Sequence, residues 1–226
     1  MSTILLIETA TDVCSVALSV QGKVIQEETL TSGKRHSAAL TGMIQSITET
    51  LPRQLRSLSA VAISEGPGSY TGLRVGASVA KALCFSLEIP LISVSTLQAL
   101  ATPYRTYDDV VMSTIDARRQ EAYAATYLKG AQQTSVESVI FTTAKVQALA
   151  LEFDQLIITG TGISKVAQLF EPYPHLIIKP SVCAASLLGP IAHEKYISKV
   201  FVDVAYYVPF YFKAPNITKP KKKLFE

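Results

Sequence analysis

A plan of strands and helices that occurs twice along the chain restricts its fold more than any other feature of the sequence. In the first half, the apolar run Thr3–Thr9 contains the carboxylate Glu8 and precedes a pair of apolar runs around a turn at residues 21–23. In the second half, the apolar run Val110–Ile115 ends at Asp116 and also precedes a hairpin pattern. Helical and strand patterns then alternate in both halves. This duplication predicts an α/β protein built from two similar lobes.

The order of the predicted elements gives this architecture its detail. In the first half we predict strands at 3–9, 14–20, 24–30, 60–64 and 90–94, and helices at 36–51, from the loop 66–72 to about residue 87, and at 95–101. In the second half we predict strands at 110–115, 121–128, 135–141, 155–159 and 176–179, and helices at 142–152, from the loop 160–162 to residue 170, and near 181–196. Two RNase-H-like lobes in this order are the architecture shared by actin, sugar kinases and Hsp70. We place an N-terminal lobe at residues 1–103 and a smaller C-terminal lobe with a basic tail at residues 104–226.

Composition excludes several classes of protein. Hydrophobic residues make up 48% of the chain and charged residues 17%, which supplies a core and excludes disorder over most of the length. The formal net charge of +3 comes partly from the run Lys219–Lys223. The folded body is therefore nearly neutral, which argues against a broad nucleic-acid-binding face. We interpret the run as a solvated end, with RNA contact as the weaker alternative.

The sequence also argues against metal binding and export. The three cysteines and three histidines lack the spacing of metal ligands, so we predict no metal site. The N-terminal segment lacks the basic start of a signal peptide, and no apolar run approaches the roughly 20 residues that span a bilayer. We therefore expect a cytoplasmic protein that does not contact a membrane.

The carboxylate at the end of the first strand of each half marks a candidate nucleotide site. In a two-lobed phosphotransferase, these carboxylates hold magnesium while the following turns offer amides and hydroxyls to phosphates. The candidates here are Glu8, Thr9 and Thr11 in the first half, and Asp116 and Arg118 in the second. Neither turn contains the glycine that close approach of a backbone to phosphate usually needs. We interpret the site as vestigial or structural, with active phosphotransfer as the alternative.

A glycine-rich loop at residues 66–72 precedes the second long helix. Its amides and the helix N-terminus are typical of an anion site, with Gly66, Gly68, Ser69 and Thr71 as candidates. The loop lacks the Lys-Ser/Thr pair of a Walker motif. The alternative is a turn that passes closely beside the first hairpin while Ser69 or Thr71 caps the helix. The sequence leaves both interpretations open.

Small residues recur at every fourth position on two helices of the first half. The two sets are Gly72, Gly76 and Ala80, and Ala38, Gly42 and Ser46. Small side chains at this spacing let a second helix approach closely. Either the two helices pack on each other, or they form a helix-bundle interface with another protein, together with Val79 and Leu83. In the second case, Gly76→Glu should break partner binding and leave the fold largely intact.

The stretch from Gly66 to Gly76 closely resembles the bacterial TsaB family, also called YeaZ. Supporting matches are Ile7–Thr11, His36-Ser37, Ser95–Ala101, Asp116–Arg119 followed by Glu121–Ala124, and Val208-Pro209 with Tyr211. The resemblance covers nearly the whole chain. The sequence departs from the family pattern at Glu8, where aspartate is common, and at Gln120, where glycine is usual.

The resemblance implies a two-lobed, non-catalytic partner of TsaD, which transfers a threonylcarbamoyl group to N6 of adenosine 37 in ANN-decoding tRNAs. In that family the helices of the N-terminal lobe pack against TsaD in a helical bundle, and the ATPase TsaE joins the assembly. We therefore expect no cofactor on the chain itself, ATP and magnesium only within the complex, and tRNA contact only through the complex. Two alternatives remain: a small ATP- and magnesium-dependent phosphotransferase that uses Glu8 and Asp116, and a homodimer that covers the same helices.

Overall fold

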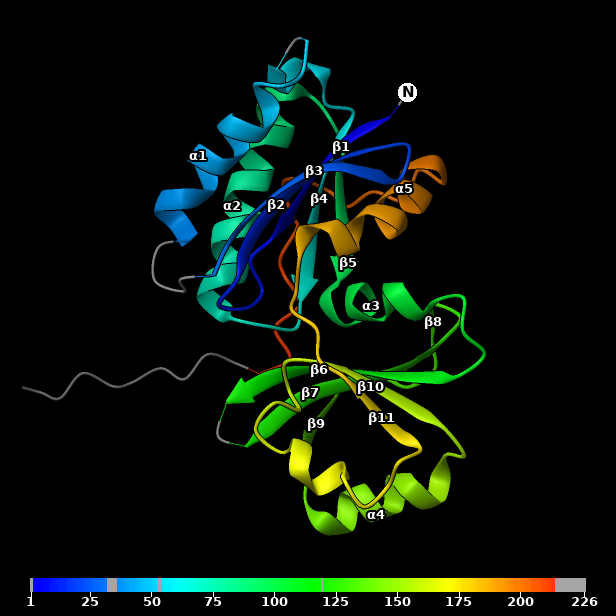
Figure 1. Cartoon of the computed structure of the whole chain (residues 1–226). Helices are drawn as coiled ribbons and strands as arrows, with labels where there is room; N and C mark the ends of the chain where they lie inside the picture. Colours follow the sequence, from blue (N-terminus) through cyan, green and yellow to red (C-terminus); the bar gives the residue numbers. More distant parts are fainter. Residues whose placement is uncertain (1, 32–35, 53, 119, 214–226) are drawn as a thin grey trace, which may run out of the picture.

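Two β-sheets with helices packed on them form the two lobes of the molecule (Figure 1). The computed structural model describes residues 2–31, 36–52, 54–118 and 120–213. Arg119 of the predicted anion-binding turn and the basic run Lys219–Lys223 lie outside the described residues. No helix in the described part of the chain is long and apolar enough to cross a lipid bilayer.

The sheet of the first lobe has the strand order β3-β2-β1-β4-β5. Its strands are β1 (Thr3–Glu8), β2 (Cys14–Val20), β3 (Lys23–Leu30), β4 (Ala60–Gly66) and β5 (Leu91–Ser95). The strands β1, β2 and β3 pair antiparallel, whereas β4 runs parallel to β1 and β5 runs parallel to β4. Nearly every residue of β1 and β4 is buried, as their unbroken apolar runs require for strands covered on both faces.

The sheet of the second lobe repeats this plan with the order β11-β10-β6-β7-β8. Its strands are β6 (Val110–Arg118), β7 (Glu121–Leu128), β8 (Ala131–Gln132), β9 (Glu137–Ile140), β10 (Leu156–Gly160) and β11 (Leu176–Lys179). Again the first strand pairs antiparallel with the second, and two later strands, β10 and β11, continue the sheet in parallel. The predicted duplication into two RNase-H-like lobes is confirmed. In place of the single strand predicted at residues 135–141, two short strands, β8 and β9, pair with β7.

Helices α1 (His36–Thr48) and α2 (Tyr70–Leu87) cover one face of the first sheet (Figure 1). Leu40, Ile44 and Ile47 of α1 join the core cluster that contains Leu5 and Val61 of the sheet. These α1 residues recur at the predicted helical spacing, and the helix is followed by the short 3-10 helix η1 (Gln54–Ser57). In the second lobe, α4 (Thr143–Glu152) buries two apolar residues in the corresponding core.

The predicted division at residue 103 separates the strands of the two sheets. It does not separate the two hydrophobic cores, because two helices pack on the sheet of the other half of the chain. Helix α3 (Thr96–Ala101) belongs to the first half of the chain, yet its Leu97 and Leu100 join the core of the second sheet. Helix α5 (Gly189–Ile197) belongs to the second half, yet its Ile191 joins the core on the far face of the first sheet. The chain therefore returns to the first lobe from residue 185, because the far face of the first sheet is apolar and needs cover.

Two predicted helices of the second half are shorter than expected. The segment up to Phe170 forms only the 3-10 helix η3 (Ala167–Phe170), because residues 161 and 162 first donate their amides to Thr114 O of β6. The helix predicted near 181–196 is a 3-10 helix, η4 (Ala185–Leu188), followed by α5. Pro190 in the first turn explains this division, since proline is favoured where a helix begins.

After α5, the chain forms an extended segment, here called the strap (Val202–Lys213). Val202 N donates to Leu91 O at 3.0 Å, and Lys81 Nζ donates to Ala205 O at 3.0 Å. Further along, Phe210 N donates to Glu65 O at 2.7 Å. The ring of Phe212 then lies 5.2 Å from that of Tyr123 in the second lobe. The strap therefore passes from the first lobe to the second.

Candidate functional site

The glycine-rich loop packs against the turn that follows β1. Ser69 N donates to Ala10 O at 2.6 Å, and a Cβ added at Gly68 would overlap that same carbonyl oxygen. A Cβ added at Gly72 would overlap the carbonyl oxygen of Thr9. The Ser69 amide is thus already engaged by the protein. These contacts support the close-packing interpretation of the loop, and the anion-site interpretation stays a prediction.

The start of α2 confirms one part of that interpretation. Ser69 is the N-cap, and its side chain accepts a hydrogen bond from Gly72 N at 3.3 Å. Thr71 is exposed and lies within the first turn of the helix. Gly66 has φ +116°, a backbone conformation that favours glycine, and the strap carbonyl of Phe210 occupies the space that a Cβ would fill. Gly66 N donates to Thr96 Oγ1 at 3.2 Å.

Glu8 lies inside the first lobe with no exposed surface. Its Oε1 accepts hydrogen bonds from Ala10 N at 2.6 Å and Ser64 Oγ at 2.9 Å, whereas Oε2 has no hydrogen-bond partner among the described residues. Burial raises the pKa of Glu8 to about 7, because desolvation outweighs the hydrogen bonds from Ala10, Ser64 and Thr9. Thr9 is also buried, and Thr11 Oγ1 accepts from Val13 N. Glu8 and Thr9 are therefore not open to a ligand, whereas Thr11 is half-buried.

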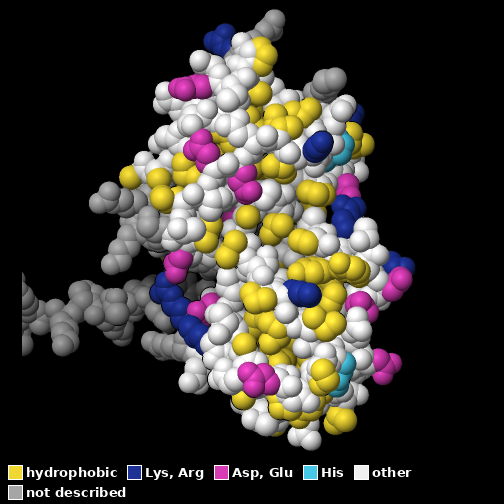
Figure 2. Space-filling model, viewed as in Figure 1, with side chains coloured by type: hydrophobic (Ala, Val, Ile, Leu, Met, Phe, Trp, Pro, Cys, Tyr) yellow, Lys and Arg dark blue, Asp and Glu magenta, His cyan; other side chains and the backbone are white. Residues whose placement is uncertain are grey.

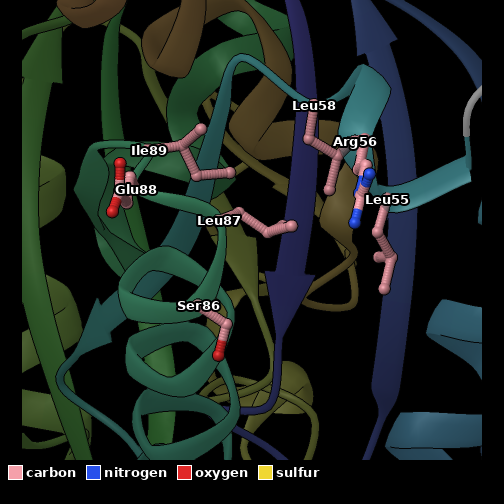
Figure 3. A pocket seen from close by; sticks show the side chains of 7 residues that line it. All are labelled: Leu55, Arg56, Leu58, Ser86, Leu87, Glu88 and Ile89. Atoms are coloured by element: carbon pink, nitrogen blue, oxygen red, sulfur yellow. The ribbon is translucent and has the colours of Figure 1, made fainter.

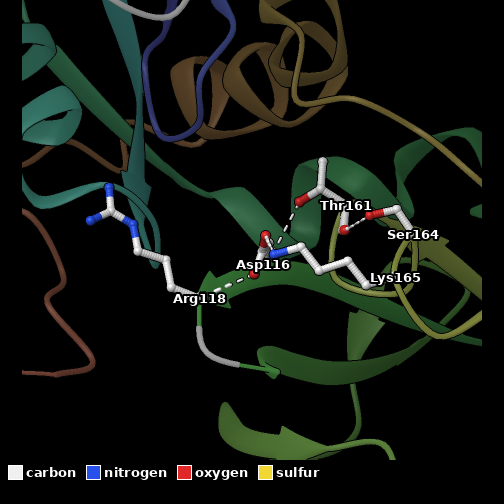
Figure 4. Close-up of polar contacts among 5 residues, drawn as sticks. All are labelled: Asp116, Arg118, Thr161, Ser164 and Lys165. Carbon is white, nitrogen blue, oxygen red and sulfur yellow. Dashed lines mark hydrogen bonds and ion pairs between the residues drawn. The ribbon is translucent and has the colours of Figure 1, made fainter.

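Asp116, the matching carboxylate of the second lobe, is held by three neighbours (Figure 4). Its Oδ2 lies 2.7 Å from Lys165 Nζ, and its Oδ1 accepts a hydrogen bond from Arg118 N at 2.8 Å. Its backbone amide donates to Thr161 Oγ1 at 3.1 Å. The Arg118 side chain points away from this cluster and toward the first lobe (Figure 4). Lys165 is a functional neighbour that the sequence analysis missed, because it lies in a loop 49 residues after Asp116.

The residues present do not fit magnesium and a nucleotide. A magnesium ion needs carboxylate oxygens that are accessible and charged. Glu8 is buried with a raised pKa, and a lysine already neutralises Asp116. Among the described residues no cluster of histidine, cysteine and acidic side chains could hold a metal ion.

The small residues of α2 face inward. Gly72, Gly76 and Ala80 are all buried, and a Cβ added at Gly76 would overlap Thr9 Oγ1. The reason for glycine here is the turn after β1, not a second helix. The structure therefore removes these three residues from the predicted partner interface, and the expectation that Gly76→Glu leaves the fold intact is wrong.

The small residues of α1 face solvent. Ala38, Gly42 and Ser46 are all exposed, and a Cβ added at Gly42 would meet no atom within 4 Å. Ser46 Oγ donates to Glu28 Oε1 at 2.6 Å on the surface. This half of the predicted interface therefore remains available to another molecule.

A groove of about 380 Å³ separates α1 from α2 beside these exposed residues. Ile44 of α1 and the half-buried Val79 and Leu83 of α2 give it an apolar floor, while Thr41, Gln45 and Glu49 form its polar wall. Val79 and Leu83 thus keep their predicted place at the surface. The groove lies on the face of the first lobe that α1 and α2 cover, beyond which no second sheet of the described residues lies (Figure 1).

A second hollow of about 290 Å³ continues beyond the groove, with Leu55 lining both (Figure 3). Figure 3 shows Leu87 of α2 pointing toward Leu58 and Arg56, which line the opposite side of this hollow. The two hollows share Leu55, and Arg56 and Glu88 are the charged residues that line the second one. The face made of the exposed α1 stripe and these two hollows is here called the α1–α2 face.

Comparisons with known proteins were made by sequence and by structure. The family model described as TsaD, tRNA N6-adenosine threonylcarbamoyltransferase, matches residues 23–220. The tRNA threonylcarbamoyladenosine biosynthesis protein TsaB of Escherichia coli K12 is 31% identical over 221 residues, which cover 93% of this chain and 94% of that protein. The TsaB of Bacillus subtilis 168 is 36% identical over 125 residues, a match that spans about half of each chain, 55% of both.

A solved structure agrees with these matches. The structure described as YeaZ from Pseudomonas aeruginosa superposes with a TM-score of 0.77 and 26% identity, covering 93% of this chain and 100% of that one. This likeness covers most of the chain and agrees with the duplicated topology described above. The chain therefore belongs to the TsaB family, also called YeaZ.

Proposed function

We propose that this protein is a non-catalytic subunit that binds a TsaD-type threonylcarbamoyltransferase through its α1–α2 face. In this role it supports threonylcarbamoyl transfer to N6 of adenosine 37 in ANN-decoding tRNAs, with TsaE joining the assembly. The observation that carries the proposal is the exposed small-residue stripe of α1 beside an apolar groove. The naming of the E. coli relative, which matches over nearly its whole length, supports the tRNA modification.

The α1–α2 face has the features that a partner helix needs. Exposed residues without large side chains let a second helix approach within the 8–10 Å that helix packing uses. Ile44, Val79 and Leu83 can then receive apolar side chains from that helix, in the way that amphipathic helices fill grooves. Burial of these side chains would supply most of the binding free energy, and the polar wall would set the register.

The environments of Glu8 and Asp116 support a role without catalysis. A phosphotransferase needs both Glu8 and Asp116 available to magnesium, but the first is buried and the second is paired with Lys165. Absence of catalysis stays a prediction, as does the cytoplasmic location, and the phosphotransferase alternative has no observation in its favour.

The proposal is tested by light scattering after gel filtration of this protein mixed with TsaD from the same cell. Gly42→Glu places a charge on the open stripe, where the new side chain meets no neighbour. Ala144→Glu is the matched control, because it adds the same group to an exposed helical position on α4 in the other lobe. We expect Gly42→Glu to weaken the complex at least about tenfold, since a buried unpaired charge at an interface costs more than 1.4 kcal/mol.

Ala144→Glu should bind as the wild-type chain does. A complex that Gly42→Glu leaves unchanged would remove the α1–α2 face from the interface. A homodimer of the wild-type chain that Gly42→Glu dissociates, with no complex with TsaD, would support the self-association alternative instead.

A further inference from the structure

Three segments that are distant in the sequence meet at one edge of the cleft between the lobes. Tyr70 and Arg74 lie in the first turns of α2, Arg118 lies at the end of β6, and Tyr211 and Lys213 lie near the end of the strap. These five residues are here called the cleft-edge cluster. Figure 2 shows Lys and Arg side chains gathered at the edge between the lobes.

Contacts between the segments hold the cluster together. The rings of Tyr70 and Tyr211 lie 4.8 Å apart, and Arg74 Cζ lies 5.4 Å from the centre of the Tyr70 ring. Arg74 also donates to Tyr70 Oη at 3.0 Å. Glu121 links the other two cations, because it pairs with Lys213 and lies opposite Arg118 in the β6–β7 register.

The cluster is open to solvent and positively charged. Tyr70 is 37% exposed, the side chain of Lys213 is 43% exposed, and Arg74 and Arg118 are classed with the exposed residues. Among the described residues, the carboxylate that pairs with a cation of this cluster is Glu121, while Lys165 pairs with Asp116.

Cations next to accessible aromatic rings are the pattern that binds single-stranded nucleic acid. Lysine and arginine attract phosphates, while bases stack on tyrosine rings and on the guanidinium plane of arginine. Duplex recognition needs a longer basic surface, which the nearly neutral body does not provide. The cluster is also a few residues across, which is the scale of a short unpaired loop.

We propose that the cleft-edge cluster is a direct contact for single-stranded RNA, and that the RNA is the unpaired loop of the tRNA on which the complex acts. This inference rests on the proposed function for the identity of the RNA, and it replaces the expectation that the chain meets tRNA only through its partner. The tilted pair Tyr70 and Tyr211 receives a base, and Arg74, Arg118 and Lys213 contact the flanking phosphates.

The test uses the full chain alone and a fluorescein-labelled RNA hairpin with an ANN-decoding anticodon loop, measured by fluorescence anisotropy from about 50 to 200 mM KCl. The triple variant Arg74→Gln, Arg118→Gln, Lys213→Gln should reduce the slope of log K against log salt by about 2, because each single-strand phosphate contact contributes about 0.7. The control triple variant is Lys23→Gln, Lys145→Gln, Lys199→Gln, which removes the same charge elsewhere and should change the slope by much less.

The aromatic part is tested separately. Tyr211→Ala should weaken hairpin binding about tenfold, and Tyr211→Phe should restore it, since stacking needs the ring and not the hydroxyl. The fully paired stem without the loop should bind weakly to every variant.

Three results would overturn the proposal: no binding of the hairpin by the wild-type chain, equal losses in the cluster and control variants, or loss of TsaD binding in the cluster variant with unchanged RNA affinity. The last result would make the cluster a protein contact. Because the RNA assay contains no TsaD and the Gly42→Glu assay contains no RNA, failure of this inference is distinguishable from failure of the proposed function.

Discussion

Helices α1 and α2 carry small residues at the same spacing and use them in opposite ways. On α2, Gly72 and Gly76 face the turn after β1, where the backbone and side chain of Thr9 leave no room for a Cβ. On α1, Gly42 faces solvent and meets nothing within 4 Å. The spacing alone therefore does not distinguish internal packing from a docking surface. The role of the stripe depends on what lies opposite it, and for α2 this is a backbone turn of its own lobe.

The largest effect that this comparison predicts is at Gly76. Gly76→Glu forces a side chain into Thr9 and buries a charge, which should lower the free energy of unfolding by about 3 kcal/mol or more. Chemical denaturation and the soluble yield would measure it, with Gly42→Glu as the control that adds the same group to the other stripe. A Gly76→Glu chain as stable as the wild type would show that the α2 stripe is not packed as described.

The next effect concerns pH, through the turn that α2 packs against. The pKa of Glu8 is raised to about 7 from 4.5, so between these values the folded chain binds a proton that the unfolded chain releases. Stability from this group is therefore fully present below pH 4.5 and is lost as pH rises through 7, by roughly 3 kcal/mol in total. Urea unfolding at about pH 5 and pH 8 should show this fall in the free energy of unfolding. Other titrating groups add their own pH-dependent contributions to the measured value.

Glu8→Gln is the variant that isolates this contribution, because the amide oxygen can still accept from Ala10 N without titrating. The difference between the wild type and Glu8→Gln should shrink or reverse toward high pH, where the wild-type carboxylate is charged and buried. A difference that is constant across this pH range would contradict the described environment of Glu8.

A double-mutant cycle measures the coupling between Thr9 of the turn and Gly76 of α2. Gly76→Ala should cost about 1–3 kcal/mol because its Cβ overlaps Thr9 Oγ1, and Thr9→Ala in the same chain should recover much of that loss. Unfolding of the two single variants and the double variant gives the coupling free energy. Additive losses would mean that another neighbour, not the Thr9 hydroxyl, excludes the side chain.

The smallest predicted effect is on the open stripe. Gly42→Ala should raise the free energy of unfolding by about 0.5–1 kcal/mol, since alanine favours a helix interior over glycine and the space is empty. The melting temperature of this variant measures the gain. A loss of stability would show that the position of Gly42 has a close neighbour or a backbone conformation that only glycine adopts.

The sequence predicts the sheets well because their signal is local and repeated. Buried apolar runs mark β1, β4 and β6, and the second copy of the pattern supports the first. Ser69 was among the predicted caps because hydroxyl residues at this position bond to helix amides. These features depend on residues near each other in the chain, which is what a single sequence records.

The remaining features depend on contacts between distant segments. Lys165 reaches Asp116 from a loop that no motif marks, and the strap carbonyl of Phe210 fills the space beside Gly66. Similarly, α5 covers the first sheet although it follows the second in the chain. The α2 part of the predicted interface fails for the same reason, because the inward direction of Gly76 is set by Thr9, 67 positions earlier, and not by the helix itself. The α1 part stays a prediction.

The central claim is that α1 presents a docking surface whereas the α2 stripe is internal. Amide hydrogen exchange of the chain, with and without TsaD, tests it most directly. The account predicts slower exchange in α1 and in η1, which line the groove, with α4 in the second lobe unchanged. Unchanged exchange in α1, together with slowing confined to the second lobe, would contradict it.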